Sequence, residues 1–177
     1  MVTRAMKPPV APRGLATPTD LEPDAVQAVA EAVNPLIADA FALYLKCKNF
    51  HWHVTGPHFR DYHLLLDEQA ASALASIDLL AERVRRIGGT TIRSIGHVSR
   101  LQTIEDDDNE LVPANQMLQR LLDDNRQIAE KQRAAIEVCD EHGDTPTGNV
   151  LQEILDETEK RIWFLFEASR TGREAAD

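Results

Sequence analysis

The stretch from His58 to Ile87 contains neither glycine nor proline, although Gly56-Pro57 precedes it and Gly88-Gly89 follows it. Proline lacks the backbone N–H that a helix needs and glycine is conformationally free, so these residues commonly end helices. The uninterrupted stretch therefore predicts one long α-helix that begins near Phe59 and stops at the glycine pair.

A second long helix is predicted from about Asp24 to His53. Its apolar residues recur at steps of three and four, as in an amphipathic helix: Val26, Val29, Val33, Ile37, Phe41 and Leu45. Pro35 interrupts this pattern. Either the helix bends at Pro35, or Asn34 caps a separate helix that has the proline in its first turn.

Two further long helices are predicted, from about Pro113 to Glu141 and from about Asn149 to Thr171. The long link before them contains one short apolar-periodic piece, about Ser94 to Gln102, which predicts a short helix. No segment alternates with period two for long enough to predict a strand. Short turns join the first two and the last two long helices. This order predicts an all-α four-helix bundle with a crossover between helices two and three, where the short helix lies.

A length of 177 residues with 43% apolar content fits one domain with a core. Residues 1–21 hold four of the nine prolines, so we expect a flexible tail, a folded domain over residues 22–172 and a short tail over residues 173–177. No apolar run approaches the roughly 18 residues of a membrane span, and no secretory signal is recognisable. We expect a cytoplasmic protein with no membrane partner, in which Cys47 and Cys139 are reduced and buried.

The net charge of −10 is unevenly distributed, because residues 1–20 carry +2. The acidic remainder should repel nucleic acid and is compatible with cations, including metal ions. The three basic residues of the tail, Arg4, Lys7 and Arg13, are the candidates for contact with DNA.

The predicted helix that begins at Phe59 carries two pairs of polar residues at i,i+4 spacing: His63 with Asp67, and Asp78 with Glu82. Each pair shares a helix face, and the eleven residues between Asp67 and Asp78 turn the helix to within about 20° of the same direction. All four side chains therefore lie on one stripe. About 22 Å of helix axis separates the pairs, which is too far for one metal ion.

A second copy of this helix, antiparallel and crossing near Ser72 and Ala73, would bring the His63 pair opposite the Asp78 pair. The stretch "QAASALAS" at the crossing contains small residues that allow two backbones to approach. A two-fold axis would make two identical sites from both chains. His51, at the end of the preceding helix, can complete each site.

Two imidazoles and three carboxylates suit iron, manganese or zinc, and carboxylates that can bridge favour a dinuclear iron centre. A His-Asp pair alone is often only a surface hydrogen bond, so the prediction depends on the whole stripe and His51. The other four histidines lack this geometry: His53 points away from His51, His58 lies in a turn, and His97 and His142 have no partner at helical spacing.

The pattern H-x11-H-x3-D-x10-D-x3-E resembles the motif of the Dps family, the DNA-protecting proteins of starved cells, which are small ferritins. The resemblance covers residues 22–172, including "AERVRRIGG" and "DETEKRIWFLFEAS". It implies a ferritin-like hollow homododecamer whose two-fold interfaces hold ferroxidase sites. These sites would oxidise Fe(II) with hydrogen peroxide in preference to dioxygen, and the shell would store ferric mineral without an organic cofactor. Larger ferritins use Glu-x-x-His motifs, which this chain lacks.

The resemblance also implies roles for single residues. His51, His63 and Asp67 would come from one subunit, and Asp78 and Glu82 from its partner. Trp52, next to His51, is similar to the family's aromatic that absorbs an oxidising equivalent; the alternative is a tryptophan that packs at the interface. Glu68, next to Asp67, is a candidate for mineral nucleation; the alternative is a solvated glutamate on the helix surface.

Asp140, Asp144 and Glu153 flank the turn into the last helix, where shells of this family form acidic three-fold pores for incoming iron. Helix capping is the alternative explanation for carboxylates at such a turn.

DNA binding in the family depends largely on basic tails, which twelve copies could use multivalently. The acidic shell opposes it. Two alternatives to an iron store remain: a nucleoid-associated DNA-binding protein whose metal site is vestigial or holds zinc, and a purely structural bundle.

Overall fold

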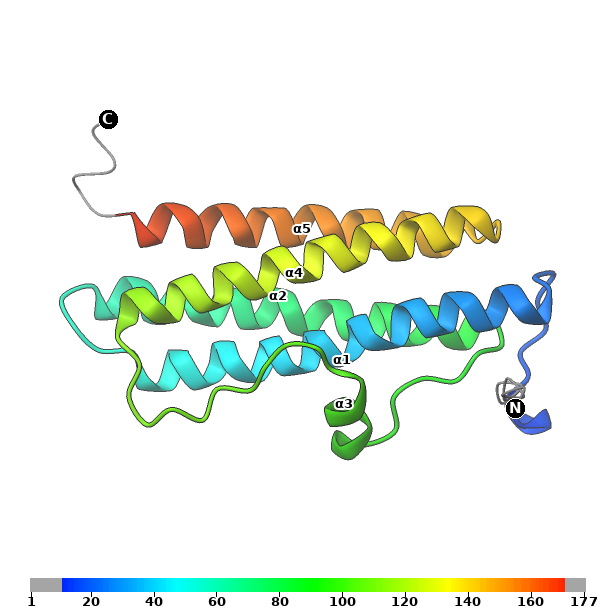
Figure 1. Ribbon diagram of the computed structural model, residues 1–177, viewed down its shortest axis with the longest axis horizontal. Coiled ribbons are helices and arrows are strands. Elements are labelled where there is room, and N and C mark those ends of the chain that lie inside the picture. The colour runs from blue at the N-terminus through cyan, green and yellow to red at the C-terminus, as the bar shows by residue number, and fades with distance from the viewer. Residues whose placement is uncertain (1–10, 171–177) are drawn as a thin grey trace, which may run out of the picture.

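The computed structural model describes residues 11–170. Within them lie a 3-10 helix η1 (Arg13–Leu15) and five α-helices, with no strand: α1 (Pro23–His53), α2 (Phe59–Arg86), α3 (Ile95–Leu101), α4 (Ala114–Glu141) and α5 (Thr145–Ser169). Helices α1 and α2 form one antiparallel pair and α4 and α5 the other, and the link that carries α3 runs back along the outside of α1 (Figure 1). The predicted four-helix bundle with a crossover and a short helix in it is confirmed.

Helix α1 is continuous through Pro35, so a separate helix capped by Asn34 is not formed. The Asn34 side chain instead donates to the carbonyl oxygen of Thr90 in the link, at 2.9 Å. Helix α1 is also long and apolar enough to cross a membrane by length and composition, contrary to the expectation that no run approaches this limit. Half of its most apolar stretch is buried inside the bundle, and helices in protein cores are apolar enough to meet the same criterion.

Two clusters of buried apolar side chains form the core. One gathers around Phe50, Leu66 and Leu118, and the other around Ile37 and Leu80. Each cluster contains one of the two free cysteines, both of which are buried as expected. Burial raises the pKa of both thiols to about 12, so neither is a reactive thiolate at neutral pH.

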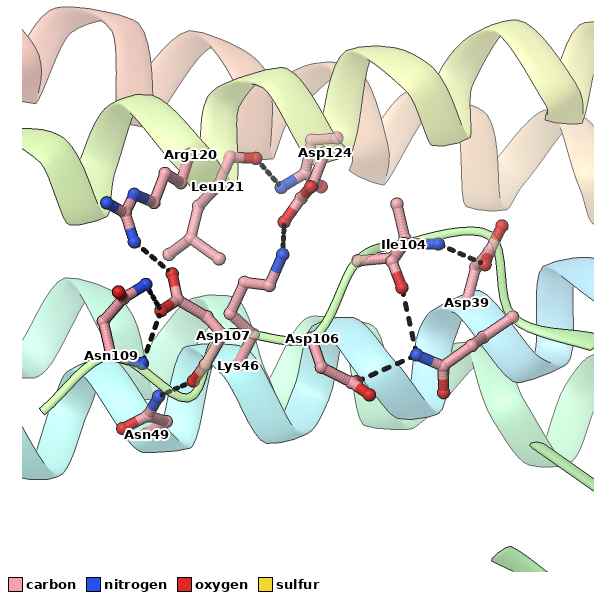
Figure 2. A network of polar contacts seen from close by, with 12 residues as sticks. Asp39, Lys46, Asn49, Ile104, Asp106, Asp107, Asn109, Arg120, Leu121 and Asp124 are labelled. Carbon is pink, nitrogen blue, oxygen red and sulfur yellow. Dashed lines mark hydrogen bonds and ion pairs between the residues drawn. The ribbon is translucent and has the colours of Figure 1, made fainter. Parts of the chain in front are cut away.

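The crossover link is held to the bundle by Asp39, a fully buried carboxylate on α1. Asp39 accepts from the Thr103 N–H at 2.5 Å, the Thr103 hydroxyl at 2.8 Å and the Ile104 N–H at 3.1 Å. Lys131 of α4 lies 3.3 Å from the same carboxylate. One buried charge thus ties α1, α4 and the link together, as Figure 2 shows for Asp39 and Ile104.

Further along the link, Asp107 joins the same two helices (Figure 2). Its carboxylate pairs with Arg120 of α4 at 2.5 Å, and its carbonyl oxygen accepts from Asn49 of α1 at 3.0 Å. Beside it, Lys46 and Asp124 form a largely buried ion pair at 2.7 Å between α1 and α4. Because this end of α1 leads directly to His51, these contacts fix the position of the first predicted ligand.

The N-terminal segment differs in part from the expected flexible tail. Arg85 of α2 donates to the carbonyl oxygen of Leu15 at 2.8 Å. Gly88 has φ +87°, and a Cβ there would lie 2.9 Å from the carbonyl oxygen of Thr17, so only glycine fits. Residues 11–21 therefore have a defined place beside the end of α2. The expected tails over residues 1–10 and 173–177 lie outside the described residues.

Candidate metal centre

His51 and His63 face each other across the turn between α1 and α2. Their rings are stacked, with centroids 3.7 Å apart. The Nδ1 atom of His51 lies 2.7 Å from the carbonyl oxygen of His63, and the Nδ1 atom of His63 lies 2.9 Å from that of His51. A carbonyl accepts only, so Nδ1 is the donor in both rings, and in the neutral form of each ring Nε2 carries the lone pair. A neutral imidazole held in this way is oriented to bind a metal ion.

Asp67 lies one helical turn beyond His63 and is exposed. Lys48 lies one helical turn before His51 on α1. Its ammonium group donates to the Asp67 carboxylate at 2.7 Å. This hydrogen bond is the main cause that lowers the pKa of Asp67, so the carboxylate keeps its charge below the ordinary range for aspartate. His51 and His63 therefore lie side by side near the start of α2, and Asp67 lies one helical turn farther along it.

Asp78 and Glu82 are exposed on α2, farther toward its C-terminal end. Glu82 forms an ion pair with Arg86 on the next helical turn. Within residues 11–170, no group of three or more His, Cys, Asp or Glu side chains lies close enough together to hold a metal ion. The division of the five predicted ligands between two chains stays a prediction.

A buried cation lies in the interior of the bundle, between Asn125, Ser72 and Thr158. Arg161 of α5 is 5% exposed and donates at 2.8 Å to Asn125, Ser72 and Thr158. Burial lowers its pKa to about 10, which still leaves it charged at neutral pH. Di-iron bundles direct Glu and Glu-x-x-His side chains inward at this depth. Here a buried positive charge repels a metal ion instead.

Comparison with known proteins shows the family to which the chain belongs. The family model of the ferritin-like domain matches residues 30–173. A "DNA protection during starvation protein 1" of Deinococcus radiodurans is 31% identical over 82% of this chain and 70% of its own length. The "DNA protection during starvation protein" of Brevibacillus brevis is 33% identical over 78% of this chain and 93% of its own length. The chain belongs to the Dps family of ferritin-like proteins.

Solved Dps structures share the fold along most of this Dps chain. "DpsC from Streptomyces coelicolor" superposes with a TM-score of 0.86 at 29% identity, covering 95% of this chain and 97% of its own. A Dps protein of Vibrio cholerae O1, described as a member of the ferritin-like diiron-carboxylate superfamily, gives a TM-score of 0.81 at 25% identity, covering 88% and 98%.

The other residues predicted near the site have the surroundings of surface groups in the single Dps chain. Trp52 is 60% exposed and borders a groove of about 800 Å³ between α1 and the link. Glu68 is exposed on α2. The Nδ1 atom of His53 lies 2.8 Å from the carbonyl oxygen of Asn49 on its own helix, and His58 precedes α2.

The residues predicted for an iron pore are divided between two environments. Asp140 and Glu153 are exposed. Asp144 is 2% exposed, accepts from the Thr147 N–H at 3.1 Å as the N-cap of α5, and pairs with Arg83 of α2 at 3.0 Å. In the chain that the structure describes, Asp144 therefore acts as the cap that the alternative explanation anticipated.

Replacing Asp144 by Ala should lower the free energy of unfolding by about 2–4 kcal/mol, since it removes a helix cap and leaves Arg83 without its carboxylate. Asp140→Ala, at an exposed position in the last turn of α4, should change it by less than about 0.5 kcal/mol. Urea unfolding followed by circular dichroism at one protein concentration measures both. Equal effects of the two substitutions would contradict the structural role of Asp144.

The sequence analysis missed Arg161 and Lys48. Arg161 could have been found, because it falls on the apolar stripe of α5 between Leu151, Ile154 and Leu165, where a charge is out of place. Lys48 had no such signal, since its pairing with Asp67 depends on how α1 and α2 pack.

Proposed function

We propose that this Dps chain oxidises Fe(II) at sites shared between two-fold-related subunits and stores the ferric product inside a hollow homododecamer in the cytoplasm. Hydrogen peroxide is the preferred oxidant and dioxygen the alternative. The observation that carries the proposal is the pair of imidazoles, His51 and His63, whose Nδ1 atoms are engaged by carbonyl oxygens, so that only Nε2 of each ring is available to a metal ion at one end of a stripe of carboxylates.

An antiparallel second copy of α2 completes the site. If the helices cross at Ser72 and Ala73, His63 lies across from Glu82, and Asp67 lies across from Asp78, because each pair is equally distant from the crossing point. Large apolar side chains are exposed along the same helix, as expected for a surface that a partner covers: Leu64, Leu74 and Leu79.

Iron is the substrate of this site, and the protein residues hold it and balance its charge. Neutral imidazoles and carboxylates bind Fe(II), and the carboxylates stabilise the higher charge of Fe(III). Two Fe(II) ions each lose one electron, and hydrogen peroxide takes up both electrons and two protons to give two water molecules. Because peroxide is reduced by two electrons together, no hydroxyl radical is released to damage DNA.

Several outer residues belong to the same proposal. Trp52, next to His51, would supply an electron when iron is scarce at the site, and Glu68 would bind ferric ions as mineral begins to form. Asp140 and Glu153, both exposed, would line the three-fold pores by which Fe(II) reaches the cavity, with Asp144 holding the start of α5 behind them.

Anaerobic addition of Fe(II) followed by peroxide tests the function. We expect about two Fe(II) oxidised per site, as in a di-iron centre, and a soluble ferric core that stays with the protein. Chromatography with mass determination should find an assembly near twelve times 19.8 kDa. Oxidation at the rate of free iron in solution, with no iron retained, would contradict the proposal and leave a site that is vestigial or holds zinc.

A second candidate function is DNA binding through the basic N-terminal segment, favoured by the names of the Deinococcus and Brevibacillus relatives. Arg4 and Lys7 lie outside the described residues, and Arg13 begins η1. A gel shift at low salt and at about 0.15 M salt, with and without residues 1–20, tests it. A shift that requires the segment supports nucleoid association, and no shift at either salt removes this candidate.

A further inference from the structure

Each half of the proposed iron site contains one carboxylate that already has a cation from its own chain. Lys48 pairs with Asp67 at 2.7 Å, and Arg86 pairs with Glu82. The Asp78 side chain makes no ion pair or hydrogen bond within residues 11–170. The side chains of Arg86 and Glu82 are 62% and 53% exposed, so Arg86 is free to change rotamer without disturbing the core.

Lys48 and Arg86 nearly neutralise the negative charge of the site when no metal ion is bound. A shared site brings together three carboxylates, Asp67, Asp78 and Glu82, and the two cations offset all but one of the negative charges. Without them, three like charges would face one another across a two-fold interface, which opposes association. A bound Fe(II) supplies the same positive charge, so the metal and the two side chains are alternatives for the same oxygens.

We propose that Arg86 is a positioning residue that competes with the incoming metal for Glu82. In the empty site the guanidinium holds the Glu82 carboxylate and keeps the interface close to neutral. When a divalent ion binds, the guanidinium leaves Glu82. This inference rests on the proposed function, because it requires Glu82 to be a ligand of the shared site.

In the proposed dimer, the second chain can bind the Arg86 guanidinium after it leaves Glu82. In the antiparallel crossing, Arg86 lies across from Phe59, one helical turn beyond the pairing of Glu82 with His63. Phe59 is 47% exposed, and its ring stacks on His63 with centroids 5.2 Å apart. An arginine over the free face of that ring gains a cation–π contact and stays out of the metal position.

Metal affinity measured without any oxidation tests this proposal. Co(II) is a suitable probe, because peroxide-free titration by calorimetry and by its visible absorption reports binding alone. Arg86→Gln should bind Co(II) about three- to tenfold more tightly than the unchanged protein at low ionic strength, because the competitor is lost. The gain should shrink at about 0.5 M salt, where exposed charges are screened.

Two variants serve as controls. Arg86→Lys keeps the competing charge. It should bind Co(II) within about twofold of the unchanged protein and so should not show the tighter binding expected for Arg86→Gln. Arg126→Gln removes an equally exposed arginine, 65% exposed and paired with Asp123 on α4, and should leave the affinity unchanged. Neither position contacts the core, so circular dichroism should show the same fold for all variants.

The outcomes separate this inference from the function on which it rests. If the unchanged protein binds Co(II), Glu82→Ala weakens binding, and Arg86→Gln has no effect or also weakens it, the competition is wrong and the shared site stands. If Glu82→Ala does not alter Co(II) binding, the shared site itself is wrong and the inference fails with it.

Discussion

Mixed assemblies of two individually inactive variants should recover roughly a quarter of the wild-type iron-oxidising sites, because a two-fold dimer divides each site between its chains. One variant carries His63→Ala and Asp67→Ala, and the other carries Asp78→Ala and Glu82→Ala. In a mixed dimer, one site loses all four of these ligands and the other keeps all of them. Random mixing makes about half of the dimers mixed, and half of the sites in those dimers are complete.

Each variant alone should oxidise Fe(II) at the rate of iron in solution while the shell still assembles, since all four residues are partly or fully exposed and none is part of the core. The measurement is the initial rate after peroxide addition, for each variant and for a sample refolded or co-expressed as a one-to-one mixture. A mixture no faster than its components would show that the ligands do not come from two chains.

Replacing Asp39 by Ala should lower the free energy of unfolding by about 3–5 kcal/mol, which is the usual cost of removing one partner from a buried ion pair. The change leaves Lys131 and the N–H groups of Thr103 and Ile104 without their acceptor. The link should then loosen from α1 around Thr103 and Ile104, while Asp107 still holds its later part. Asp39→Asn, which keeps one acceptor oxygen, should cost less than Asp39→Ala.

The measurement is the urea midpoint at one protein concentration, since assembly adds stability by mass action. Asp123→Ala, whose side chain is 58% exposed on α4, is the matched control and should stay within about 0.5 kcal/mol of the unchanged protein. Hydrogen exchange in residues 102–110 should rise in Asp39→Ala ahead of global unfolding. An Asp39→Ala variant as stable as the control would contradict the role of this carboxylate.

The helices could be predicted from the sequence because their signals are local. Glycine and proline mark the ends of α2, and the three- and four-residue steps of apolar side chains mark the buried side of α1. The stripe of His63, Asp67, Asp78 and Glu82 was equally accessible, because it follows from the geometry of one helix. The division of the ligands between chains remains a prediction that the mixing experiment tests.

The features that were missed depend on contacts between distant segments. The docking of Leu15 on Arg85 joins residues 70 positions apart, and the pairing of Asp144 with Arg83 joins residues 61 apart. Composition predicted a flexible tail around Leu15, because prolines are frequent there. The family resemblance implied a pore role for Asp144, with helix capping as the alternative. Only the packing of α2 against its neighbours shows that Leu15 and Asp144 have partners there.

The reciprocal bonds between the His51 and His63 rings and each other's carbonyl groups also bear on when this chain becomes active. They set both rings in place within a single subunit, before any partner arrives. A newly made subunit would therefore have His51 and His63 already oriented, but it would lack the carboxylates that a partner supplies for iron oxidation. On the proposed function, oxidation begins only after two subunits have met, so the ferric product forms where an enclosure is being built to receive it.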